Sequence, residues 1–503
     1  MHVNYYSGVR GLRPLDLTEK KGKKVEIFFE GKKLEAYEGE KLTVALLANG
    51  IYWLTTSTEG RKRGAFTFGP VPMVVDGIKN VDARKTKVRE GMKVERQRYG
   101  EFQEEPVGEY SGKPKQVVVD VAVVGGGPAG IGATLEVQDY LTVALVEEKG
   151  WLGGDMWIKG VEQEGFKGSP QEVIKKLTSE FNENVTTFLG TSALGVFEKG
   201  EYFLVPAVRG NELIEIMAKR VILATGAVDS IMLFENNDMP GVFRRDFALE
   251  VMNVWEVAPG WNVAVTGSKA EEVIIELERW GIDYVHIPNV KRVEGSEKVE
   301  KVIDMNGNEY KVDALIFSDG RRPDINPITQ AGGKLFFRRG YYRPVIDSLH
   351  RIKEGIYVAG SAVSIKPHYA NYIEGRLAGA YILREFGFES EPCVYEEKLK
   401  EFEPEALQVP KIPFEKFNLA DVQICGCDVS LKKVDDVVRR GIKDLQIIKR
   451  LTHLAMGFCQ GRYCLFNGAV VVSQRTGVKL SEIDLPVARP PIKNVRMGVL
   501  ARR

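Results

Sequence analysis

The 503-residue sequence lacks several features that would each place it in a broad functional class. No apolar run is long enough to cross a membrane, and the first residues contain no apolar signal core. Net charge is also nearly absent, because 70 lysines and arginines are balanced by 69 aspartates and glutamates. This balance excludes a basic surface field for nucleic acid or a membrane. We therefore expect a cytoplasmic protein without a membrane span.

Common catalytic signatures are missing too. The sequence contains no H-E-x-x-H, P-loop or G-x-S-x-G pattern, and residues 248–324 include no cysteine for a C-x-x-C redox disulfide. Among the five histidines, His368 either lines a flavin edge or is an ordinary polar residue near a helix start. We therefore name no catalytic acid or base. The high lysine and glutamate content favours a thermophile.

Cysteine is scarce, but four of the five cysteines form two tight pairs. Cys425 and Cys427 make a C-x-C pair, and Cys459 and Cys464 make a C-x4-C pair. Four converging thiolates complete the iron coordination of a 2Fe–2S cluster. Structural zinc is one alternative, although C-x-C is unusual there, and two disulfides are another. We predict a 2Fe–2S centre.

Residues 120–148 have the pattern of a dinucleotide-binding unit, with a buried strand, a glycine-rich turn, a helix and a second strand. The turn should place backbone N–H groups and a helix N-terminus against a pyrophosphate. An acidic residue after the second strand is suited to bind a ribose. The predicted contacts are Gly125, Gly127, Pro128, Ala129, Gly130, Glu147 and Glu148.

Further markers follow in the order of a two-dinucleotide-domain flavin reductase. Ala224, Thr225 and Gly226 end a strand where the chain should cross the nucleotide, and Gly360 and Ser361 follow the returning strand. We include all five in the predicted site. Two departures weaken the usual cofactor assignment. A serine occupies position 361, where flavin reductases commonly carry aspartate. The second turn keeps Gly267 but has Lys269 where a glycine is expected.

The chain as a whole resembles the α subunits of heteromeric sarcosine oxidases and dye-linked L-proline dehydrogenases. Residues 456–464 are similar to the bacterioferritin-associated-ferredoxin-like region of these subunits, and residues 25–92 resemble their N-terminal β-grasp ferredoxin-like domain. In the family that domain carries a cysteine cluster, but residues 63–73 contain no cysteine here. The resemblance implies FAD or ATP on the first dinucleotide unit, FMN at an interface with a β subunit, and a 2Fe–2S cluster.

We expect an α/β fold with two dinucleotide-binding domains, the second inserted in the first, between an N-terminal β-grasp-like domain and a C-terminal helical iron–sulfur domain. The expected boundaries are 1–117 for the β-grasp-like domain and linker, 118–247 with 325–390 for the first dinucleotide domain, 248–324 for the insertion, and 391–503 for the cysteine-bearing domain. Residues 486–491 predict an extended tail that wraps another surface.

The favoured function is an electron-transfer α subunit of an L-proline, sarcosine or related secondary-amine dehydrogenase. The resemblance implies that a sarcosine-oxidase-like β subunit oxidises the amine and passes electrons through FMN to the cluster. A self-contained NAD(P)H oxidoreductase is the first alternative, with NAD(H) binding left open because of Lys269. A nucleotide-binding scaffold with decayed redox sites is the second.

Overall fold

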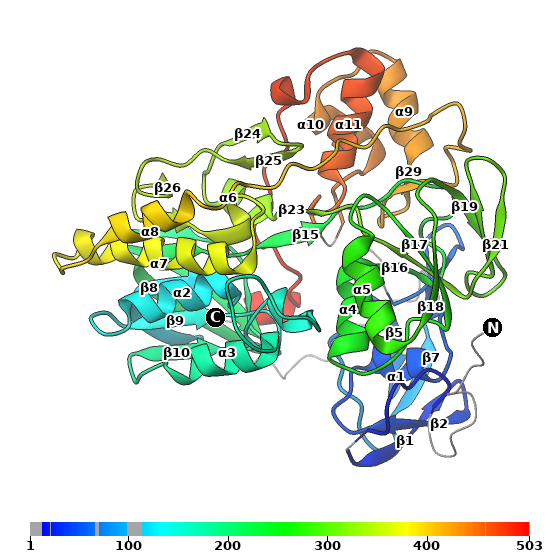
Figure 1. The fold of residues 1–503 in the computed structure, drawn as a ribbon, viewed down its shortest axis with the longest axis horizontal. Helices are drawn as coiled ribbons and strands as arrows, with labels where there is room; N and C mark the ends of the chain where they lie inside the picture. The colour runs from blue at the N-terminus through cyan, green and yellow to red at the C-terminus, as the bar shows by residue number, and fades with distance from the viewer. Residues whose placement is uncertain (1–12, 21, 66–69, 98–112, 458, 502–503) are drawn as a thin grey trace.

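The structure is a computed structural model that describes residues 13–20, 22–65, 70–97, 113–457 and 459–501 (Figure 1). Within these ranges, no helix combines the length and apolar character needed to cross a bilayer. The expected fold class is confirmed, since the described chain contains an N-terminal sheet, two dinucleotide-type units and a helical C-terminal region. The division at particular residue numbers stays a prediction.

The N-terminal unit contains a five-stranded sheet in the order β2-β1-β7-β5-β6. The hairpin expected at Glu30 and Gly31 forms, because both residues have the positive φ that such a turn requires. The expected charged linker falls largely on residues 98–112, which lie outside the described residues. The elements are β1 (Lys24–Phe29), β2 (Lys32–Tyr37), α1 (Leu42–Ala48), β3 (Thr55–Thr56), β4 (Lys62–Arg63), β5 (Pro72–Val75), β6 (Ile78–Asp82) and β7 (Lys93–Arg96).

The first dinucleotide unit is built on a nine-stranded sheet whose central strands are parallel. The strand that returns after the insertion pairs with β14, and α2 packs against α7 on one face (Figure 1). The elements before the insertion are β8 (Lys115–Val124), α2 (Pro128–Val137), β9 (Val143–Val146), η1 (Met156–Ile158), α3 (Pro170–Ser179), β10 (Val185–Phe188), β11 (Ser192–Ala193), β12 (Phe197–Lys199), β13 (Tyr202–Arg209) and β14 (Glu212–Leu223). Those after it are α6 (Ile325–Gln330), β24 (Leu335–Arg338), β25 (Tyr341–Pro344), β26 (Arg351–Lys353), β27 (Ile356–Val358), η2 (Gly360–Ala362) and α7 (His368–Glu385).

The inserted unit has a parallel four-stranded sheet in the order β16-β22-β17-β18, and the chain enters and leaves it through the paired strands β15 and β23. Its sheet already includes residues 242–244, upstream of the expected boundary at 248. The elements are β15 (Ala227–Asp229), β16 (Val242–Arg244), α4 (Arg245–Asn253), β17 (Asn262–Thr266), α5 (Glu271–Trp280), β18 (Asp283–His286), β19 (Val290–Glu294), β20 (Lys301–Asp304), β21 (Glu309–Lys311), β22 (Ala314–Phe317) and β23 (Arg321–Pro323).

The C-terminal unit is helical apart from one short hairpin. The side chains of Ser430 and Asp444 cap α9 and α10, which fixes where both helices begin. Residues 483–496 of this unit form no helix or strand, in line with the extended tail that the sequence predicts. Within this tail, Lys493 pairs with Glu148 of the first dinucleotide unit at 2.6 Å. The elements are β28 (Gln423–Cys425), β29 (Val429–Ser430), α9 (Leu431–Arg439), α10 (Leu445–Thr452), α11 (Leu465–Thr476), η3 (Leu480–Glu482) and α12 (Met497–Leu500), while the preceding α8 (Pro392–Leu399) packs against α7 of the first dinucleotide unit.

One hydrophobic core crosses the boundaries between units. It joins Val44 of α1, Val265 of β17 and Ile424 of β28, and it includes the side chains of Cys425 and Cys464. The cysteine-bearing unit is therefore packed onto its neighbours, which fixes its cysteines relative to the rest of the molecule.

Candidate nucleotide and thiolate sites

The glycine-rich turn between β8 and α2 presents an uncapped helix start. Gly127 is the N-cap of α2, and no side chain caps the N–H groups of the first turn. An added Cβ at Gly127 would come no closer than 4.0 Å to any heavy atom, that atom being the Gly154 Cα. Free N–H groups, an open approach and the positive end of the helix dipole together suit an anion such as a pyrophosphate.

The neighbouring glycines serve the fold itself. A Cβ on Gly125 would lie 2.3 Å from the Ala224 carbonyl oxygen, and one on Gly130 would lie 1.9 Å from that of Gly125. Gly125 also has a φ of +109°, which L side chains rarely adopt. The turn therefore depends on two glycines for packing and leaves Gly127 free to face a ligand.

Glu147 lies at the end of β9, beside the turn. Its carboxylate accepts the Gly126 and Lys149 N–H groups, both at 2.7 Å. Burial raises the pKa of this carboxyl, and the two N–H donors oppose that rise. Each carboxylate oxygen retains acceptor capacity, so Glu147 remains suited to ribose hydroxyls. Glu148 pairs instead with Lys493, and this and other cations lower the pKa of its exposed carboxyl below the usual range.

The other predicted nucleotide contacts surround the same turn. The Ala224 N–H donates to the Val124 carbonyl at 2.9 Å, and Gly226 has a φ of +72°. The Gly360 N–H donates to Glu374 at 2.9 Å, and the Ser361 hydroxyl accepts from Asn371 at 3.0 Å.

Two buried polar atoms near this turn have no partner within the described protein and are available to bind a ligand. The hydroxyl of Thr225 and the amide oxygen of Asn371 have no hydrogen-bond partner among the described protein atoms. Buried polar groups are seldom left unpaired in a native protein. Their placement fits a polar ligand such as an adenine nucleotide.

A buried ion cluster that sequence reasoning missed lies one residue beyond Gly154. Asp155 pairs with Arg245 at 2.7 Å and with Arg321 at 3.1 Å, and it contacts His368 at 3.3 Å. Burial would raise the pKa of Asp155, but the two arginines hold it well below its usual range. Because these residues come from separate segments, no local spacing in the sequence signals the cluster.

His368 is the first residue of α7 and belongs to this cluster. Its other ring nitrogen lies 2.7 Å from Gln163 Oε1. Burial lowers the pKa of this imidazole, and the hydrogen bond to Asp155 opposes that shift. Both ring nitrogens are thus engaged by protein side chains.

The second dinucleotide turn is closed by its own side chains. Lys269 forms an ion pair with Glu405 of the segment that leads into the C-terminal unit. The helix that follows, α5, has Glu271 and Glu272 in its first turn. Glu272 pairs with Arg245 at 2.7 Å and with Lys159 at 2.8 Å, so the exposed negative charge at this helix start comes from Glu271 and disfavours a phosphate.

The four paired cysteines lie close together in the C-terminal unit. Cys425 and Cys464 are buried in one core, Cys427 packs against that core, and Cys459 is half-buried. All five cysteines of the chain are free thiols, so neither pair is a disulfide. The fifth, Cys393, lies exposed on α8.

Backbone N–H groups surround these sulfurs. Hydrogen bonds from Cys427 and Cys464 lower the pKa of Cys425, and the Cys427 and Ala455 N–H groups add to this effect. The backbone of Gly457 lies directly against the Cys427 sulfur, since a Cβ added there would lie 2.0 Å from Sγ. N–H groups directed at sulfur stabilise thiolates, and such bonds tune iron–sulfur clusters.

The donor set consists of four thiols, which is the ligand set of a 2Fe–2S cluster and also of a structural zinc ion. Within the described ranges, no three histidine, cysteine, aspartate or glutamate side chains are arranged to hold a single ion. A 2Fe–2S cluster needs only two thiolates on each iron. We keep zinc as the alternative to be excluded by experiment.

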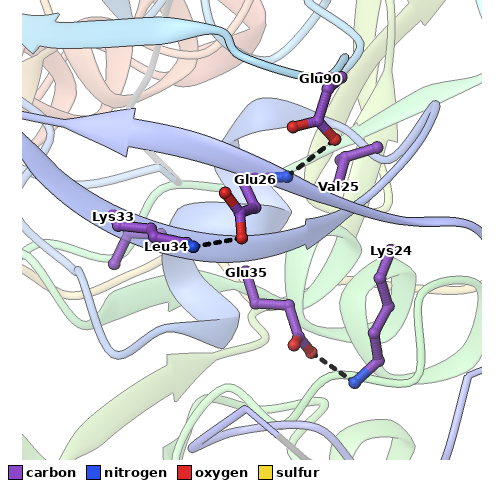
Figure 2. Close-up of a pocket in the computed structure, with 7 residues that line it drawn as sticks. All are labelled: Lys24, Val25, Glu26, Lys33, Leu34, Glu35 and Glu90. Carbon is purple, nitrogen blue, oxygen red and sulfur yellow. Dashed lines mark hydrogen bonds and ion pairs between the residues drawn. The ribbon is translucent and has the colours of Figure 1, made fainter.

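A surface hollow of about 560 Å³ along β1 and β2 is not a candidate site (Figure 2). Figure 2 shows its charged side chains turned toward one another, with Lys33 paired to Glu26 and Lys24 paired to Glu35. Exposed pairs of this kind neutralise each other and contribute about 0–1 kcal/mol to stability. The hollow is a solvated sheet surface.

Comparisons with known proteins agree with this arrangement. A family profile described as pyridine nucleotide-disulphide oxidoreductase matches residues 119–270 and 262–376. A profile described as sarcosine oxidase A3 domain matches residues 421–503, which contain all four paired cysteines. A third, described as a 2Fe-2S iron-sulfur cluster binding domain, matches residues 22–99, which contain no cysteine.

Two curated relatives are distant. The chain is 25% identical over 428 residues to the α subunit of sarcosine oxidase from Rhizobium meliloti, a match that spans 76% of this chain and 42% of the relative. It is 23% identical over 563 aligned positions to the α subunit of sarcosine oxidase from Corynebacterium sp. (strain P-1), across 96% and 57% of the two chains. The chain thus spans about half the length of these sarcosine oxidase relatives.

A solved structure is far more similar. The crystal structure of L-proline dehydrogenase from P. horikoshii is 77% identical, with a TM-score of 0.95, and the match covers 98% of this chain and 100% of the other. Fold and profiles define an oxidoreductase of the pyridine nucleotide-disulphide type with an appended cysteine-bearing domain. The chain belongs to the family of sarcosine oxidase α-like proteins that includes this L-proline dehydrogenase.

Proposed function

We propose that the chain is the electron-transfer α subunit of a heteromeric L-proline dehydrogenase, or of a dehydrogenase for a related secondary amine. The similarity to an L-proline dehydrogenase over nearly the whole chain carries this proposal. The convergence of four thiols in a fold of the dinucleotide-binding type supports it. No residue here is assigned as the acid or base for amine oxidation, which suits a relay.

The proposed relay has three stations. A sarcosine-oxidase-like β subunit oxidises the amine, FMN at the subunit interface accepts the electrons, and a 2Fe–2S cluster receives them next. When bound, the cluster supplies one-electron chemistry. The residues that hold it are Cys425, Cys427, Cys459 and Cys464.

We assign an adenine nucleotide, FAD or ATP, to the turn at residues 125–130. The open approach at Gly127 and the carboxylate of Glu147 support this assignment. The buried ion cluster around Asp155 begins next to Gly154, whose Cα lies 4.0 Å from a Cβ added at Gly127. Extraction and chromatography of the bound nucleotide would decide between the two.

The main experiment compares the chain alone with the chain co-expressed with a β-type subunit. L-proline, sarcosine and hydroxyproline are each tested with an artificial dye acceptor. We expect activity and co-purification only with the partner, and iron with acid-labile sulfide in the purified protein. Proline oxidation by the isolated chain would refute the relay, and stoichiometric zinc without sulfide would refute the cluster.

A paired substitution tests which thiols matter. Cys464→Ser should remove the iron because it breaks the group of four, whereas Cys393→Ser should leave iron and sulfide unchanged because Cys393 stands apart on α8. Equal iron content in the two variants would contradict the ligand assignment. The alternative of a self-contained NAD(P)H oxidoreductase gains nothing from the structure, because the second turn is closed by Lys269 and followed by two acids.

A further inference from the structure

The N-terminal unit contacts the loop that carries the first cysteine pair. Its β3–β4 hairpin reaches residues 426–428 of the C-terminal unit, more than 360 positions away in the sequence. This unit matches a cluster-binding profile but contains no cysteine between residues 22 and 99. Its composition therefore gives no reason to expect a contact with the cysteines of another unit.

Arg63, at the end of β4, makes the central contact. Its guanidinium donates to the carbonyl oxygen of Gly426 at 2.8 Å, between the two cysteines of the C-x-C pair. The same group pairs with Asp428 at 2.5 Å and with Asp238 at 3.2 Å. The Arg63 side chain is 8% exposed, so these bonds are shielded from water.

The loop needs such support because its backbone turns sharply after Cys427. Asp428 has a φ of +56°, in the left-handed region that costs a non-glycine residue free energy. Its carboxylate accepts the Thr58 N–H at 2.7 Å and also contacts the Thr58 hydroxyl. The hairpin therefore stabilises the turn through both carboxylate oxygens of Asp428, since Thr58 donates to one oxygen and Arg63 to the other.

The local charge balance indicates how Arg63 acts. Its positive charge is offset by Asp238 and Asp428, so little net field reaches the sulfurs. The specific contribution of Arg63 is its planar guanidinium, which bonds both the Gly426 carbonyl and the Asp428 carboxylate. A lysine side chain does not reproduce this geometry.

We infer that Arg63 is a positioning residue through which the N-terminal unit, without thiolates of its own, fixes the Cys425–Cys427 loop for cluster binding. This inference rests on the proposed cluster. It gives the N-terminal unit a role in the same electron-transfer site, exerted through hydrogen bonds to the loop.

The test uses the full-length chain, purified without oxygen, and three substitutions. Arg63→Met removes the fork, Arg63→Lys keeps the charge, and Arg61→Met is the matched control. Arg61 projects from the same hairpin and shares Asp238 with Arg63, but it forms no hydrogen bond or ion pair with the described residues 425–428, and its other acidic partner is Asp421. The readouts are the rate of iron release to a chelator, the EPR spectrum of the reduced protein, and the alkylation rate of the iron-free thiols.

We expect Arg63→Met to release iron about 10- to 100-fold faster, the usual effect of losing a partner that orients a metal ligand. Its EPR signal should change shape, Arg63→Lys should be intermediate, and Arg61→Met should match the parent protein. Release rates and spectra equal to the parent in Arg63→Met would overturn the inference. If Arg63→Met does not fold, Thr58→Val removes one hydroxyl contact to Asp428 and should shift both readouts in the same direction by less.

Failure of the cluster itself would be distinguishable. A parent protein without iron or sulfide refutes the proposed cluster, and the thiol measurement then decides the role of Arg63. Faster alkylation of Cys425 and Cys427 in Arg63→Met than in Arg61→Met would still show that the hairpin positions the loop. Equal alkylation rates would refute that role.

Discussion

The two dinucleotide turns of this molecule have the same backbone conformation at their first glycine but different surroundings. Gly125 and Gly267 have φ values of +109° and +108°, and a Cβ on each would lie 2.3 and 2.2 Å from a carbonyl oxygen of the crossing strand. Two residues further along, the first turn has Gly127, where an added Cβ would come no closer than 4.0 Å to another atom. The second turn has Lys269, which is paired with Glu405. Turn geometry alone therefore does not make a phosphate site.

The helices that follow sharpen the contrast. Neither α2 nor α5 has a side-chain N-cap, but α5 places two carboxylates in its first turn and α2 places none. Of these two helix starts, that of α2 is both uncapped and free of negative charge. The start of α2 therefore suits a ligand anion better than the start of α5 does.

The largest effect on the difference between the two turns is expected from a substitution that closes the first turn to a ligand. In Gly127→Val the new side chain enters the space that we propose for the pyrophosphate, and the Gly127 φ of −76° accepts any residue. We expect nucleotide affinity to fall at least about 100-fold, or about 2.8 kcal/mol, with the fold retained. Nucleotide content and circular dichroism measure the two effects.

Gly150→Val is the matched control, because an added Cβ there meets no atom within 4 Å. It should retain the nucleotide in full. Loss of nucleotide from both variants, or from neither, would contradict the placement of the ligand at Gly127.

A second pair of variants tests the shared backbone. Gly125→Ala and Gly267→Ala each force a Cβ against a carbonyl oxygen at a positive φ. We expect each to lower the free energy of unfolding by about 1–3 kcal/mol. Thermal or denaturant unfolding measures the loss, and only Gly125→Ala should also reduce nucleotide content. Clearly unequal losses of stability would show that the two turns are less alike than their geometry indicates.

A capped helix provides the contrasting case. Ser169 and Glu172 form a capping box on α3, so the N–H groups there are already satisfied. Ser169→Ala should cost about 1 kcal/mol of stability and leave nucleotide content unchanged. The control is Ser179→Ala in the last turn of α3, expected within about 0.5 kcal/mol of the parent. A change in nucleotide content with Ser169→Ala would mean that α3 takes part in binding.

The smallest expected effect concerns the second turn. Glu271→Gln removes one exposed carboxylate from the start of α5 and leaves the Lys269–Glu405 pair in place. A charge at a helix terminus contributes about 0.3–1 kcal/mol, so NADH should bind no more than about fivefold tighter. Titration with NADH measures this, and Glu278→Gln at the other end of α5 serves as the control. A gain above about tenfold would show that the second turn was almost competent.

Local patterns in the sequence sufficed for the parts of the fold in which neighbours along the chain decide the structure. Glycine spacing predicted the turn after β8, and the carboxylate of Glu147 after β9 accepts an N–H of that turn. The hairpin at Glu30 and Gly31 and the convergence of the four cysteines also followed from short motifs. These features depend on backbone conformation and residue chemistry within a few positions, which a sequence records directly.

Only the tertiary structure decided which surfaces those motifs face. Asp155 with Arg245 and Arg321, Lys269 with Glu405, and Arg63 with Gly426 are pairs from distant segments. Each combines common charged or backbone groups that any surface position could hold. Their partners are chosen by how the four units pack around one core, and the free energy of that packing is spread over many residues with no motif of its own.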